Sequence, residues 1–157
     1  MLRRFLLLLS AVALLVGLCG CAGVEIPFSA EPFTADVMFQ SAGTDIKGEI
    51  TYNSPSDIVF VVKEPENIKG LTFRESKETK SIGIGDVSFT PDAEKESGIY
   101  ILFDALQAMG ESDIYLPASG LKEISVESRN GNCILIFDCA DKKLVSAEIK
   151  GYSYNFE

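Results

Sequence analysis

The sequence predicts an α+β fold that is mainly β, with one antiparallel sheet and one main amphipathic helix packed against it. Three observations support this prediction. Hydrophobic and polar residues alternate with a period of two over most of residues 33–157, short polar turns separate the alternating runs, and one segment near residue 100 follows the helical period instead. We therefore expect about nine strands and one helix in a single globular domain over residues 33–157.

The first strands follow from clean alternation. Runs 33–40 and 46–53 predict two half-buried strands joined by a polar turn at 41–45. Run 58–62 is hydrophobic on both faces, so we expect it near the centre of the sheet. A fourth strand is expected around Phe73.

The segment 82–89 predicts a fifth strand. Gly83 and Gly85 within it suggest a bulge or a close approach of another backbone. The run of strands then gives way to the helical segment.

The helix is predicted from a start signal and a hydrophobic stripe. Thr90, Pro91 and Asp92 are typical of a helix start, and Gly98 is expected to interrupt the helix. Beyond Gly98, a stripe within about 120° of arc faces the sheet at 100° per residue. It consists of Ile99, Leu102, Phe103, Leu106 and Met109, opposite Asp104, Gln107 and Ala108, with Gly110 as the expected stop. Segment 99–103 taken alone also fits a strand, which is the alternative.

The remainder of the chain returns to strands. Asn130-Gly131 is a strong hairpin signal between strands 121–128 and 133–139. A short strand is expected at 114–116, and a last run from 144 is expected to continue through Phe156.

The amino end has the features of an export signal. Arg3 and Arg4 precede an almost unbroken hydrophobic run of 12 residues, 5–16, which is too short for a transmembrane helix of about 20 residues. Residues 1–20 are therefore interpreted as a lipoprotein signal peptide, because Leu18-Cys19-Gly20-Cys21 resembles the bacterial lipobox. Cleavage before Cys19 and ordinary signal peptidase cleavage near Ala22-Gly23 are the alternatives.

The lipobox resemblance implies a lipid anchor. Cys21 would carry a diacylglyceryl thioether, with palmitate-type chains, and two such chains make release from a membrane negligible. Residues 21–32 are expected to form the lipidated amino terminus and a flexible tether, because Pro27 and Pro32 lie in a segment without a clear period. The expected location is extracytoplasmic, with the membrane as partner; the leaflet and envelope type stay open.

Composition excludes several other functions. After residue 20 the chain has 12 basic and 23 acidic residues, so nucleic acid and anionic surfaces are not expected partners. The sequence has no His, the commonest general base and metal ligand, so we expect no enzymatic activity, catalytic residue, metal or cofactor. Cys133 and Cys139 lie too far apart along one strand to form a disulfide and are interpreted as buried thiols.

Two segments resemble a known family. Residues 48–58, with Tyr52 and Pro55, and the break at 65–70 resemble lipoprotein carriers of the LolA/LolB type and related lipid-binding lipoproteins. The resemblance covers residues 33–110 and implies a curved antiparallel half-barrel with an amphipathic helix against its concave face. It departs from the carriers in two ways. The soluble carrier is not lipidated, whereas Cys21 would tether this chain. The carriers also use an Arg on the strand lining to hold the closed state, and no Arg occurs in the matching segment 48–58.

One hydrophobic set is the candidate ligand-binding site. Its members are expected to point inward from the strands and the helix, where they line a cleft for a lipid or another hydrophobic ligand. They are Phe39, Ile50, Tyr52, Phe60, Phe73, Leu102, Phe103, Leu106, Leu135 and Phe137. The alternative is a filled core in an envelope structural or protein-interaction module, with no small-molecule ligand.

Overall fold

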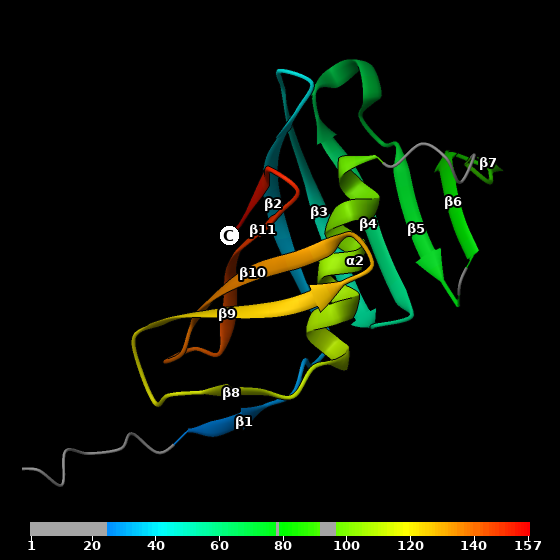
Figure 1. Cartoon of the computed structure of the whole chain (residues 1–157). Coiled ribbons are helices and arrows are strands. Elements are labelled where there is room, and N and C mark those ends of the chain that lie inside the picture. Colours follow the sequence, from blue (N-terminus) through cyan, green and yellow to red (C-terminus); the bar gives the residue numbers. More distant parts are fainter. Residues whose placement is uncertain (1–24, 78, 92–96) are drawn as a thin grey trace, which may run out of the picture.

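The computed structural model describes residues 25–77, 79–91 and 97–157, and in these ranges ten strands form one curved antiparallel sheet (Figure 1). The two outer strands, β7 and β9, do not pair with each other, so the sheet stays open. In spatial order the strands are β7 (Val87–Phe89), β6 (Thr79–Ile84), β5 (Thr72–Ser76), β4 (Asp57–Glu64), β3 (Thr44–Ser54), β2 (Phe33–Ser41), β12 (Tyr152–Phe156), β11 (Lys143–Ile149), β10 (Gly131–Asp138) and β9 (Leu121–Ser128).

Helix α2 (Gly98–Glu111) lies across the concave side of this sheet (Figure 1). Strands β3 and β4 run behind it, and the β9–β10 hairpin crosses on its other side. The predicted fold class, a curved antiparallel half-barrel with a helix against its concave face, is therefore confirmed.

A second, two-stranded sheet lies outside the main one. It pairs β1 (Ile26–Phe28) with β8 (Ile114–Leu116) in antiparallel register. The segment 21–32, expected as a tether, thus includes a strand. The signal peptide 1–20 and Cys21 lie outside the described residues. A short 3-10 helix, η1 (Glu66–Ile68), follows β4 at the expected break.

Two expected continuous strands are hairpins instead. Segment 82–89 divides into the end of β6 and β7, because Gly85 has a φ of +56° and turns the chain. The run from 144 to Phe156 divides into β11 and β12 at Lys150 and Gly151, whose φ angles are +50° and +80°. Two consecutive positive φ angles are typical of a two-residue hairpin turn. The described chain accordingly has twelve strands rather than about nine.

The start of the helix differs from the prediction. Thr90 and Pro91 are not helical, Asp92 lies outside the described residues, and α2 begins at Gly98 with Ser97 as its cap. The Ser97 hydroxyl accepts a hydrogen bond from the Tyr100 backbone N–H at 3.4 Å. Gly98, expected as an interruption, is the first residue of the helix.

The expected polar face and stop of the helix are also corrected. Asp104 and Ala108 are buried, because the β9–β10 hairpin covers the side expected to face solvent, and Gln107 is half-buried. Gly110 lies inside the helix, where an added Cβ would collide with the Tyr52 hydroxyl. The strand alternative for residues 99–103 is wrong, since these residues are helical.

Candidate functional site

The ten residues of the predicted ligand site lie together in the core. Each has an exposed fraction between 0% and 7%, and they form one cluster between α2 and the concave face of the sheet. Within this cluster the rings of Phe39 and Phe60 pack edge to face, with centroids 6.1 Å apart. In this conformation α2 fills the concave face, so a ligand would reach these residues only by displacing the helix.

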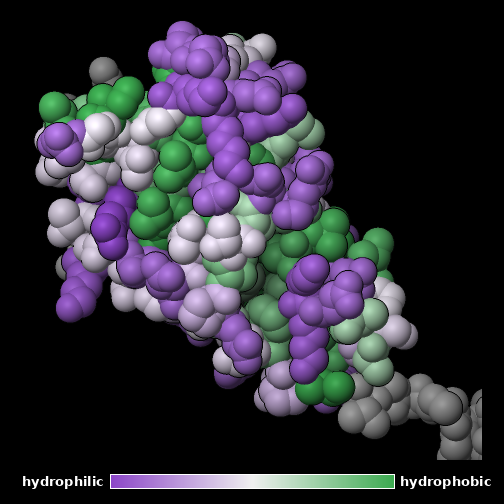
Figure 2. All heavy atoms as spheres, turned by 180° about the vertical axis from the view of Figure 1, so that it is seen from behind, coloured by the Kyte–Doolittle hydropathy of each residue, from purple (hydrophilic) through white to green (hydrophobic). Residues whose placement is uncertain are grey.

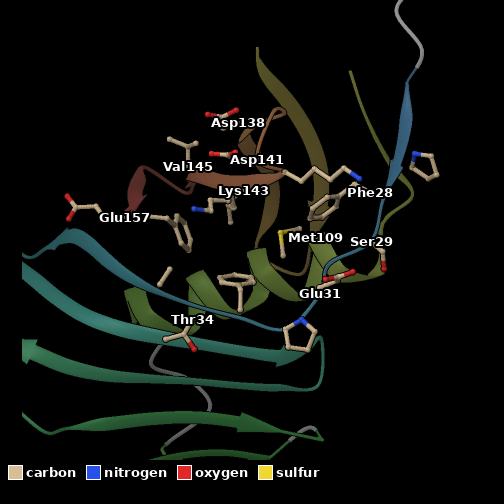
Figure 3. Close-up of a pocket in the computed structure, with 17 residues that line it drawn as sticks. Phe28, Ser29, Glu31, Thr34, Met109, Asp138, Asp141, Lys143, Val145 and Glu157 are labelled. Atoms are coloured by element: carbon tan, nitrogen blue, oxygen red, sulfur yellow. The ribbon is translucent and has the colours of Figure 1, made fainter. Parts of the chain in front are cut away.

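A pocket opens elsewhere, where the sheet is split. It has a volume of about 680 Å³ and lies between the start of β2, the start of β11, the segment after β1 and the carboxyl end of α2 (Figure 3). None of the ten predicted residues lines it. Figure 2 shows hydrophobic surface around a hollow beside the start of the described chain.

The split lies beyond the described pairing of β12. β12 pairs with β2 only at positions 37–39, and the backbone N–H of Glu157 makes one further hydrogen bond to the Asp36 carbonyl at 2.9 Å. On its other side β12 pairs with β11 only at positions 146–149. Residues 33–35 and 143–145 therefore face each other across the pocket without a described strand between them.

The floor of the pocket is hydrophobic and is held by the core. The ring centroids of Phe28 and Phe137 are 4.9 Å apart, and Phe33 stacks on Tyr52 with ring centroids 5.3 Å apart. Met109 reaches the pocket from α2, where Figure 3 shows its sulfur near Phe28. Because packed residues fix these side chains from behind, the floor is formed before any ligand arrives.

The rim of the pocket is charged and has an acidic excess. Figure 3 shows Asp138, Asp141 and Lys143 on one side, and Glu31 on the other. With Lys142 and Glu157, the lining carries four carboxylates and two ammonium groups. Such a rim repels an anionic headgroup and tolerates a neutral one.

Sequence reasoning misses this site for a physical reason. Phe28 lies in the segment expected as a tether, although a large hydrophobic residue there is a signal of burial. The split depends on where β12 stops pairing with β2, and residue types alone do not give that register.

A group of polar and charged residues lies over the middle of α2. Glu75 of β5 is buried, and its carboxylate is 3.8 Å from Arg129 and 3.7 Å from Lys80. Asn130 Nδ2 donates a hydrogen bond to Asp104 of α2, which is also buried. These contacts join β5 to the β9–β10 turn across the helix.

Burial controls the titration of this group. Loss of water around Glu75 raises its pKa, with a further rise from Asp104 and opposition from Lys80 and Arg129. Burial and the nearby Glu75 raise the pKa of Tyr100 to about 12. One oxygen of Glu75 and one of Asp104 have no hydrogen-bond partner among the described residues.

The described residues contain no evident metal centre. No group of three or more potential metal ligands occurs among them. Cys133 and Cys139 are both buried and unpaired, and burial raises the pKa of Cys133 to about 11, which leaves a protonated, unreactive thiol at neutral pH. In the same part of the chain, no helix has the length and hydrophobicity needed to span a bilayer.

Comparison with known proteins gives remote structural similarity only. No protein-family model and no curated protein matches the sequence. An uncharacterized conserved protein from Thermus thermophilus is similar at 10% identity and a TM-score of 0.42, over 80% of this chain and 76% of that one. A LolA superfamily protein from Nitrosomonas europaea is similar at 8% identity and a TM-score of 0.44, over 84% and 86%. Similarity at this level assigns no family, ligand or activity to this chain.

Proposed function

We propose that this chain is a non-enzymatic, extracytoplasmic lipoprotein, anchored by acyl chains on Cys21, that binds a lipid or another hydrophobic ligand. The observation that carries the ligand proposal is the pocket at the split in the sheet. Its volume of about 680 Å³ lies within the range of about 300–1,000 Å³ for small-molecule sites. A hydrophobic floor under a polar rim is the usual arrangement of such sites.

The anchor proposal rests on the sequence at the amino end. Leu18-Cys19-Gly20-Cys21 follows a basic start and a short hydrophobic run. Labelled palmitate should enter the full-length chain and should not enter the Cys21→Ser variant. Equal labelling of both chains would overturn the anchor.

The charge of the rim narrows the ligand class. The excess of carboxylates disfavours a fatty acid or a phospholipid with an anionic headgroup at the mouth. We therefore expect an acyl chain with an uncharged head, such as a monoacylglycerol.

A pocket-filling variant tests the ligand proposal. Ala35 is half-buried, points inward from β2 and lines the pocket, so Ala35→Phe places a ring in the space for the ligand. Nile red, a neutral probe, should bind the chain from residue 21 onward and be displaced by monopalmitoylglycerol. Ala35→Phe should weaken both affinities by about tenfold or more, equivalent to at least ~1.4 kcal/mol.

The matched control is Ala118→Phe. Ala118 is exposed and does not line the pocket, so the same substitution there should leave binding unchanged. Equal binding by both variants, or no binding by the unmodified chain, would overturn the ligand proposal.

A second candidate is an envelope interaction module with a filled core. It is favoured by the packed concave face and by the β6–β7 edge, where Ile84, Val87 and Phe89 are 54–68% exposed. An exposed sheet edge with hydrophobic side chains is a common site of strand addition. A photo-crosslinking residue at position 89 should capture one discrete envelope protein in cells if this candidate is right, and none if it is wrong.

A further inference from the structure

The end of the molecule formed by β1 and β8 exposes large hydrophobic side chains. Tyr115 and Leu121 have exposed fractions of 52% and 72%. Tyr115 is opposite Pro27 in the strand pair, so both point to the outer side of this small sheet. The Nζ of Lys122 lies 3.9 Å from a Glu25 carboxylate oxygen, which brings the neighbouring Leu121 to the same end.

The position of β1 limits how far this end can lie from Cys21. β1 begins at Ile26, five residues beyond Cys21. A fully extended chain spans at most about 3.6 Å per residue, so Ile26 lies within about 18 Å of the Cys21 backbone. This maximum distance is much shorter than the one that a flexible tether over residues 21–32 would allow.

We infer that the outer face of the β1–β8 end, with Pro27, Tyr115 and Leu121, docks on the surface of the lipid bilayer. The inference rests on the proposed acylation of Cys21, which holds this end close to the headgroups. Aromatic side chains with a polar tip, such as Tyr115, favour the membrane–water interface. Moving an exposed aliphatic side chain beside it out of water has a favourable free energy.

The charges of this end fit shallow docking. Glu25 is paired with Lys122, so its carboxylate adds little net charge at the contact. Glu31, Asp138 and Asp141 on the pocket rim stay hydrated and resist deeper entry. We therefore place the contact at the headgroups of a zwitterionic bilayer, because an anionic surface would repel the acidic rim.

Docking also fixes which way the pocket faces. Residues 27–33, which are the end of β1, the connection after it and the first residue of β2, line the pocket almost continuously. The mouth of the pocket then lies near the bilayer, from which a neutral acyl chain can enter. The β6–β7 edge lies at the opposite end of the molecule (Figure 1) and points away from the membrane.

Two single-Trp variants test the docking inference. The sequence contains no Trp, so each introduced indole is the sole reporter. Tyr115→Trp places it in the proposed contact, and Phe89→Trp places it at the opposite edge, where the native side chain is similarly exposed at 56%. Leu121→Trp is a second reporter in the contact if Tyr115→Trp fails to fold.

The acylated full chain is reconstituted in phosphatidylcholine vesicles with and without brominated lipid, and bound protein is separated by flotation. For Tyr115→Trp we expect emission at shorter wavelength and quenching several-fold stronger than for Phe89→Trp. If the protein binds the vesicles but quenching is equal at the two positions, the docking inference is overturned and the proposed anchor is not. Protein that does not float with the vesicles overturns the proposed anchor as well, so the two failures are distinguishable.

Discussion

The middle of α2 and its carboxyl end meet the sheet in opposite ways. Over the middle, Glu75 of β5 pairs with Arg129, and Asn130 donates a hydrogen bond to the helix, so strands from both halves of the sheet are joined across it. At the carboxyl end, Met109 reaches an open pocket where β12 stops pairing. Open space in this fold therefore depends on the extent of strand pairing, while the concave face itself is filled.

The largest expected effect separates the filled region from the open one. Leu106 on α2 is completely buried, so Leu106→Ala leaves a cavity and should lower the free energy of unfolding by about 2–5 kcal/mol. Leu144 lines the pocket and is half-buried, so Leu144→Ala should cost less than half as much. Urea unfolding followed by circular dichroism measures both changes.

Equal costs at positions 106 and 144 would contradict the comparison. They would mean that the pocket is as tightly packed as the concave face. A change in the dependence of the unfolding free energy on urea would instead indicate an altered unfolded state, so both slopes are compared first.

Two buried tyrosines give the next effect, one at each end of α2. The Tyr154 hydroxyl donates a hydrogen bond to the Gly98 carbonyl at 2.6 Å, while the Tyr52 hydroxyl, close to Gly110, has no partner among the described residues. Tyr154→Phe removes this buried hydrogen bond and should cost about 0.5–1.5 kcal/mol. Tyr52→Phe removes an unpaired buried hydroxyl and should be neutral or stabilising.

Thermal or urea unfolding of the two Phe variants measures this difference, and each tyrosine is the control for the other. A cost at Tyr52 as large as that at Tyr154 would mean that the Tyr52 hydroxyl is satisfied, for example by water. The carboxyl end of the helix would then be held by polar contacts, like its amino end.

Much of the fold is predictable because it follows from local patterns. Alternation places β2, β3 and β4, and Asn130-Gly131 places the β9–β10 turn. Prediction fails where a single glycine decides between a bulge and a turn, as at Gly85. The prediction of a solvent-exposed helix face is wrong at Asp104, because Asp104 is buried by a hairpin more than 15 residues away along the chain.

The candidate site is less predictable than the fold. Phe103 and Phe137 are recognisable as inward-facing, and both are buried, but the inward face holds the core and not an open cleft. The pocket is formed by Phe28, Met109 and Leu144, which meet only because three segments distant in sequence converge where the sheet splits. No period or motif encodes that convergence.

The smallest expected effect concerns pH and the polar group over the middle of α2. Burial raises the pKa of Glu75 above its ordinary value of 4.5, so the folded chain holds the proton more tightly than the unfolded chain. The contribution of Glu75 to stability is therefore complete below pH 4.5 and is lost as the pH rises through the folded-state pKa. Glu75→Gln cannot ionise and should lack this loss.

The difference in unfolding free energy between Glu75→Gln and the unmodified chain isolates this residue, since the other carboxylates contribute to both. We expect the variant to gain in relative stability from pH 4.5 upward and to level off once Glu75 is ionised. The opposite slope would mean that Lys80 and Arg129 outweigh burial and hold the pKa of Glu75 below 4.5. Net attraction between charges would then hold the middle of the helix to the sheet. If instead the difference in unfolding free energy rises with pH, packing holds this region, and the two basic residues only limit the cost of a buried carboxylate.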